Sequence, residues 1–248
     1  MGRGGSDYSA TYLGALLKAD EIWFFTDVDG LMTADPEVIS NARVIPSSSY
    51  AEIAEMAHFG ARVVHPRAME PLMKQGIPLR IRSVDHLGVT GTYIFANTAP
   101  TDHRIHAVTH VRGIVVHGPT QSNMAEACNR VLSSFLLDEI EPTLQAQTYG
   151  SSLLVYLVPT SANRFSFDSY LQQLRNYDTG DDWRVNEVII LAVIGSLRLV
   201  DMAQVLTALA AANIQPIAFG QGQRGVFMVC ITPQELNSAL QTIHRLIP

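Results

Sequence analysis

The sequence predicts an α/β protein whose first part forms a sheet with helices and whose second part forms two ferredoxin-like modules. In the first part, nearly continuous apolar runs at 22–28 and 77–84 alternate with helical patterns. Such runs are typical of strands that are buried on both faces of a sheet. A polar, proline-containing stretch at 96–104 indicates a linker. Beyond it, the order strand–helix–strand–strand–helix occurs twice, which is most of a βαββαβ unit. The expected units are residues 1–98, a linker at 99–104, and residues 105–248.

The helices of the first part are predicted from residues that typically begin or end a helix. Residues 7–18 carry a leucine stripe, and Ser6 or Asp7 is the expected N-cap. Two more helices are expected at 49–60 and 66–76, and both end on glycine. The second of these begins with proline, which the first turn of a helix tolerates.

The two rounds of the second part follow the same order of elements. The first round is predicted as strand 106–118, helix 123–137, strands 143–149 and 152–158, and helix 167–177. The second round is predicted as strand 186–195, helix 199–213, strands 215–221 and 224–231, and helix 233–247. The first strand is expected to pair into the later module.

Composition excludes several classes of protein. The chain has 248 residues, 47% of them hydrophobic, and a formal net charge of −6, so it has a sizeable core and lacks the basic footprint of a nucleic-acid binder. No apolar run approaches the roughly 20 residues that span a bilayer, so no membrane partner is expected. The two cysteines indicate a reducing cytoplasm, and the scattered histidines indicate no metal site.

A glycine-rich turn, GRGGSD at 2–7, opens the first helix. Glycines let the backbone approach a ligand closely, and the N–H groups of a helix N-terminus favour an anion. Arg3 adds a guanidinium that suits a carboxylate or phosphate. A capped turn before a helix is the simpler explanation of this segment taken alone.

A second motif, TDVDG at 26–30, follows the first predicted strand. Ligands of α/β sheets bind beyond the carboxyl ends of the strands. Asp27 and Asp29 could bind a ribose, lie near a metal, or simply build the turn.

A third motif, FGARVVHPRA at 59–68, places glycine and a basic residue before a helix. Arg62 could reach a phosphate, although by itself it could equally be a surface arginine.

Together, in this order, the three motifs resemble the aspartate kinase branch of the amino-acid kinase family. The resemblance is dense over residues 2–98 and looser over 104–248, where that family carries two ACT modules. It implies a partial, carbamate kinase-like three-layer sheet, followed by ACT-type regulation. It also implies transfer of the γ-phosphoryl group of MgATP to the side-chain carboxylate of L-aspartate, the first step toward lysine, threonine and methionine.

The resemblance assigns roles to individual residues. The substrate would be bound by Arg3 and Ser6, with Asp7 as the catalytic residue. The ATP site would comprise Thr26, Asp27, Met32, Glu37, Arg62 and Val63. An effector amino acid, lysine or threonine, would contact Gly118, Ser122 and Asn123.

Some positions depart from the family pattern. The family often has tyrosine at the position of Met32 and arginine at that of Glu37, so a ring contact is lost and a charge is reversed. A Lys-Phe-Gly-Gly turn, which supplies a phosphate-adjacent lysine in the family, has no match here, so this chain by itself is expected to be inactive. The sequence therefore leaves open a second function, that of a non-catalytic amino-acid-binding regulatory subunit.

Association is expected through the second part of the chain. The strands at 152–158 and 226–231 are apolar and short of charge, and an exposed edge of this kind invites a partner strand. We therefore expect a homodimer through the ACT modules, or a partner chain that supplies the rest of the kinase domain.

Overall fold

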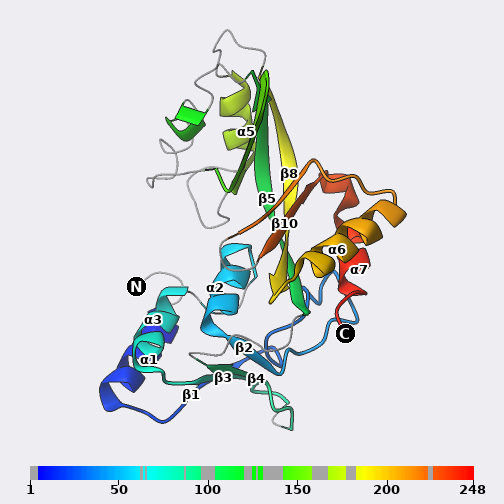
Figure 1. Ribbon diagram of the computed structural model, residues 1–248. Helices are drawn as coiled ribbons and strands as arrows, with labels where there is room; N and C mark the ends of the chain where they lie inside the picture. The colour runs from blue at the N-terminus through cyan, green and yellow to red at the C-terminus, as the bar shows by residue number, and fades with distance from the viewer. Residues whose placement is uncertain are drawn as a thin grey trace.

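The computed structural model describes most of the chain as two sheets with their helices. The described residues are 5–61, 64, 66–86, 88–95, 104–119, 125–126, 128–130, 142–157, 167–176, 183–222 and 226–248. An N-terminal part (5–95) holds a four-stranded sheet, and a C-terminal part (104–248) holds a six-stranded sheet (Figure 1). No helix in these ranges is long and apolar enough to cross a bilayer.

The N-terminal part is the expected α/β layer. It contains α1 (Gly5–Leu17), β1 (Ile22–Thr26), β2 (Ser47–Ser49), α2 (Tyr50–His58), α3 (Pro66–Gln75), β3 (Leu79–Ser83) and β4 (Thr92–Phe95). The sheet order is β1-β3-β4-β2, with parallel outer pairs and an antiparallel central pair. Strands β2 and β4 were not predicted, because three serines and a four-residue strand carry too little apolar alternation to signal a strand.

One face of this sheet packs against α2 and α3. Helix α2 begins at a capping box, in which Ser49 and Glu52 satisfy each other's backbone N–H groups. The Tyr50 hydroxyl reaches across and donates to the carbonyl of Ile77, 2.5 Å away. The core between the helices and the sheet consists of apolar side chains that are at most 3% exposed: Ile53, Met56, Met69, Leu72, Leu79, Ile81 and Ile94.

The opposite face of the sheet is open. Trp23 and Phe25 on β1 are 45% and 51% exposed. The Arg80 guanidinium lies over two rings of this face, 5.7 Å from the centre of Trp23 and 4.9 Å from that of Tyr93. The described residues therefore supply two of the three layers that the sequence predicted.

The C-terminal part confirms the repeated order of elements. The first round contains β5 (Ile105–Gly118), β6 (Leu144–Thr148), β7 (Ser151–Leu157) and α5 (Phe167–Asn176). The second contains β8 (Arg184–Gly195), α6 (Leu199–Ala211), β9 (Ala218–Gln221), β10 (Phe227–Ile231), a 3-10 turn (Pro233–Glu235) and α7 (Leu236–His244). The helix expected at 123–137 lies largely outside the described residues.

Both rounds share one sheet with the order β6-β7-β5-β8-β10-β9. The long strands β5 and β8 pair antiparallel at its centre, so the first strand does pair into the later module. Helices α6 and α7 lie on one side of this sheet and α2 on the other (Figure 1), and a hydrophobic core fills each side.

Two apolar strands were expected to be exposed edges that need an external partner strand, and this expectation was wrong. The strands expected at 152–158 and 226–231 became β7 and β10. Both are interior strands, the first flanked by β6 and β5 and the second by β9 and β8. The edges are the more polar β6 and β9. The structure thus satisfies β7 and β10 within one chain, and their apolar character gives no argument for a dimer.

Candidate functional site

The carboxyl ends of β1 and β3 define one edge of the N-terminal sheet. The two strands are parallel, and Thr26 stands opposite Ser83 in their register. The Thr26 hydroxyl donates to the carbonyl of Val28 (3.0 Å) and accepts from its N–H (3.2 Å), which closes a tight turn. Asp27 sits exposed in that turn. Since ligands of α/β sheets bind beyond the carboxyl ends of strands, this edge is the candidate site.

A histidine that the sequence analysis did not single out lies at the same edge. His86 Nδ1 is 2.8 Å from Asp29 Oδ1, although 57 positions separate the two residues. The loop is held in place because Ser83 Oγ accepts from the backbone N–H groups of Asp85 (3.1 Å) and His86 (3.2 Å). The hydrogen bond to Asp29, together with the negative charge of Asp29, raises the pKa of His86 above the ordinary value of a histidine.

Gly30 lets the chain turn sharply out of this edge. Its φ is +152°, and a Cβ there would lie 2.6 Å from Thr92 Oγ1. That buried hydroxyl accepts from the N–H of Leu31 (2.8 Å) and donates to the carbonyl of Ile45 (2.6 Å). The backbone before and after the loop 31–45 is therefore anchored to β4.

Two predicted nucleotide residues lie on this loop. Met32 is partly exposed and forms an isolated bridge with Val44. Glu37 is exposed, and its N–H donates to Asp35 Oδ1 (2.9 Å) in a local turn. The structure thus presents both positions from one ordered loop.

The same loop is fastened to the C-terminal part through Thr33. Its hydroxyl lies 2.9 Å from His244 Nε2 and accepts from the N–H of Arg43 at 2.9 Å. The Thr33 carbonyl accepts from the N–H of Val108 on β5, also at 2.9 Å. The Arg43 side chain in turn donates to the carbonyl of Ile247 at 2.9 Å. The candidate nucleotide loop and the C-terminal helix are therefore one hydrogen-bonded unit.

The remaining predicted residues are dispersed or undescribed. Asp7 is half-buried in the first turn of α1, where a carboxylate complements the helix dipole, and Ser6 donates to it at 3.3 Å. Gly118 ends β5, paired with Ser152. Five predicted residues lie outside the described ranges: Arg3, Arg62, Val63, Ser122 and Asn123.

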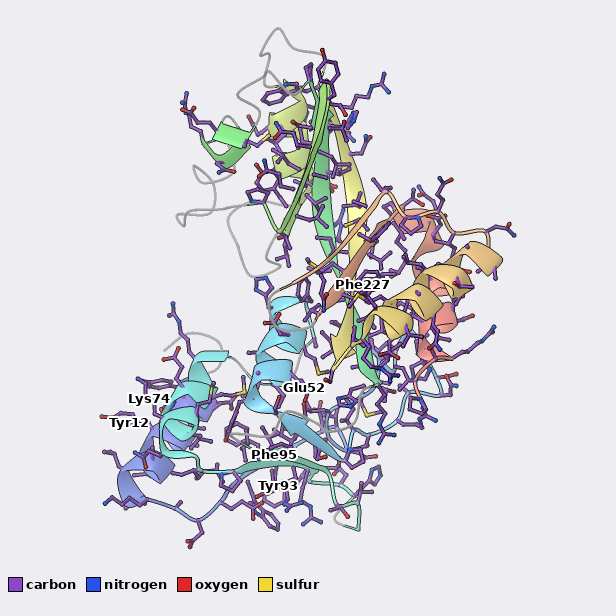
Figure 2. All side chains as sticks on the ribbon, in the orientation of Figure 1. Tyr12, Glu52, Lys74, Tyr93, Phe95 and Phe227 are labelled. Atoms are coloured by element: carbon purple, nitrogen blue, oxygen red, sulfur yellow. The ribbon has the colours of Figure 1, made fainter. Side chains whose placement is uncertain are left out.

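A cavity of about 210 Å³ lies between α1 and α3, and none of the predicted residues is among its lining side chains. Tyr8, Tyr12 and Lys74 are among its lining side chains, and Figure 2 shows Tyr12 and Lys74 on these neighbouring helices. In the described part of the chain, no three His, Cys, Asp or Glu side chains come together as a metal cluster.

Comparison with known proteins identifies the family that the N-terminal part resembles. Residues 1–83 match the model of the amino acid kinase family, so this segment is part of an amino acid kinase domain. The bifunctional aspartokinase/homoserine dehydrogenase of Haemophilus influenzae is 30% identical over 253 residues, which cover 98% of this chain and 31% of that protein. The chain thus spans about a third of the length of this relative.

Solved structures agree over the whole chain. Aspartate kinase from Clostridium acetobutylicum superposes with a TM-score of 0.84 at 20% identity, covering 100% of this chain and 59% of that one. Aspartokinase III of E. coli, in complex with lysine and aspartate, superposes with a TM-score of 0.73 at 25% identity, covering 100% and 56%. Over its whole length the chain therefore has the fold of a little over half of each of these two aspartate kinases.

Proposed function

We propose that this chain forms the nucleotide side and the regulatory region of an aspartate kinase, which phosphorylates the side-chain carboxylate of L-aspartate with ATP. Residues 1–98 would be the kinase segment and 105–248 the regulatory segment. The observation that carries the proposal is the Thr26–Asp27 turn at the shared carboxyl edge of β1 and β3. The complex of E. coli aspartokinase III with aspartate and lysine supports the choice of substrate.

The nucleotide would bind at this edge. The exposed carboxylate of Asp27 is an acceptor for ribose hydroxyls, and Thr26 keeps the turn closed. Met32 and Glu37 would approach from the loop 31–45, and Arg62 and Val63 from the segment after α2. Phosphoryl transfer depends on positioning and on neutralising negative charge, so ordered backbone around the nucleotide matters directly.

The aspartate substrate would be held from the other end of the segment. Arg3 would bind its α-carboxylate, Ser6 would add a hydroxyl contact, and Asp7 would organise the reacting groups. Mg²⁺ would reach the site with the nucleotide, because this ion is commonly held by phosphates, waters and one or two carboxylates.

Binding of ADP to the purified chain tests the proposal. Asp27→Ala should weaken ADP binding about tenfold, the typical effect of losing a hydrogen bond to a charged group. Asp20→Ala is the matched control, because Asp20 is an exposed aspartate that precedes β1, at the opposite end of the strand. Titration calorimetry that finds equal affinities for the two variants would contradict the assigned site.

The regulatory segment suggests a second, non-catalytic function. Lysine or threonine would bind near Gly118, Ser122 and Asn123, and the chain would pair as a homodimer through residues 105–248. If the chain is a regulatory subunit, L-lysine or L-threonine should bind while ADP does not. Sedimentation with and without these amino acids tests the dimer.

A further inference from the structure

Strand β5 contains a bulge at His106. Ile105 pairs with Gly195 and Ala107 pairs with Ile194, which leaves His106 as an extra residue. Residues 105 and 107 would share a face in a regular strand. Here Ile105 packs in the core with α6 and α7, whereas Ala107 packs in the core with α2. The bulge therefore reverses the facing of the strand at this point, as β-bulges commonly do next to functional sites.

Gly195 permits this irregularity. Its φ is +151°, and a Cβ there would lie 2.2 Å from the backbone carbonyl oxygen of Arg104. A side chain at this position would push β5 away from β8. The bulge is thus built into both strands.

His106 lies against the first turn of α2. Its Nδ1 donates to Glu52 Oε1 at 2.9 Å, and the two side chains are 17% and 14% exposed. The other oxygen of Glu52 accepts from the N–H of Ser49 at 2.9 Å and from the hydroxyl of Ser48 at 3.0 Å. Burial acts to raise the pKa of Glu52, but these hydrogen bonds and the charge of His106 lower it below its ordinary value. One carboxylate therefore caps α2 and binds β5 of the six-stranded sheet; Figure 2 labels Glu52 on this helix.

The far end of α2 is held by the same strand. The hydroxyl of Thr109 donates to the carbonyl of Phe59 at 3.0 Å. Gly60 has φ +93°, and a Cβ there would lie 2.7 Å from the carbonyl oxygen of His110. Both ends of the nine-residue helix are thus fixed to β5, and the segment that leaves it carries Arg62 and Val63.

We propose that His106 is a positioning residue: through Glu52 it fixes α2 to β5 of the six-stranded sheet, so that the C-terminal part sets the nucleotide affinity of the N-terminal part. The predicted effect on nucleotide affinity rests on the proposed function. The attachment of α2 to β5 rests only on the contacts between them. A change in β5 is transmitted through Glu52 to α2, the helix that precedes Arg62 and Val63 in the sequence.

Hydrogen exchange of the full chain, without nucleotide, tests the link. His106→Phe keeps a planar ring but removes the donor to Glu52, and should raise amide exchange across α2 about tenfold. His117→Phe is the matched control, since His117 is an exposed histidine on the same strand. Unchanged exchange in His106→Phe, or an equal increase in both variants, would refute the link.

Affinity for ADP tests the functional consequence. His106→Phe should weaken ADP binding roughly fivefold to tenfold, and Glu52→Gln should do the same, although glutamine still caps the helix. Because both act through one contact, the double variant should be no weaker than either single variant. Additive effects would overturn the inference. If His106→Phe does not fold, the amide exchange and the ADP affinity of Glu52→Gln test the inference instead. A wild-type chain that binds no ADP would refute the proposed function, while the exchange data still decide the link.

Discussion

Replacing Thr33 with valine removes the hydroxyl that joins the candidate nucleotide loop to the C-terminal helix. This hydroxyl is buried and lies 2.9 Å both from His244 Nε2 and from the N–H of Arg43. Valine has a similar shape but offers neither a donor nor an acceptor. Two polar groups would then lose a partner at the junction of the two parts.

The expected loss follows from those two contacts. A buried group left without its hydrogen bond costs about 1–3 kcal/mol, so two such groups give about 2–6 kcal/mol of destabilisation. That is a large fraction of the 5–15 kcal/mol typical of a folded domain. Thr33→Val should therefore unfold at a clearly lower urea concentration than the wild type.

Urea titration followed by circular dichroism measures this effect. The matched control is Thr207→Val on α6, where an exposed hydroxyl donates to the Ala203 carbonyl at 2.7 Å. The control should change stability by less than about 0.5 kcal/mol. If the two variants unfold at the same midpoint, the Thr33 contacts do not hold the junction together.

Three further predictions concern stability. Tyr50→Phe removes the donor to the Ile77 carbonyl and should cost about 1–3 kcal/mol, measured as a lower melting temperature. Gly91→Ala should be far more damaging than Gly76→Ala in a solubility and melting comparison. Both glycines have positive φ, but a Cβ on Gly91 would lie 2.0 Å from a backbone oxygen, whereas Gly76 has open space. Burial and the charge of Arg43 lower the pKa of His244, so the unfolded chain binds its proton first as pH falls. Stability should decline below about pH 6.5, and His244→Gln should flatten that decline; an unchanged slope would contradict the assignment.

Local patterns predicted the elements that carry strong signals. The apolar runs became β1 and β3, and the repeated order of the second part became β5 to α7. The helix expected at 49–60 became α2, which ends just before Gly60. These features depend on neighbours within a few residues, which is why the sequence predicts them.

The candidate site was predicted only in part. Thr26 and Asp27 were expected at a carboxyl edge, and the parallel pairing of β1 with β3 supplies that edge. His86 was missed, because a histidine in a polar loop has no distinguishing pattern. Its contact with Asp29 exists because two strands, 57 positions apart at these residues, end side by side.

By itself, the sequence determined the family resemblance, the α/β class and the order of the elements. Tertiary structure decided which strands are interior, so β7 and β10 found partners within the chain. It also decided that Thr33 meets His244, 211 positions away, and that a single extra residue turns His106 toward Glu52. The physical reason is that such contacts depend on strand register and helix placement, and a shift of one residue moves a side chain to the other face of a sheet.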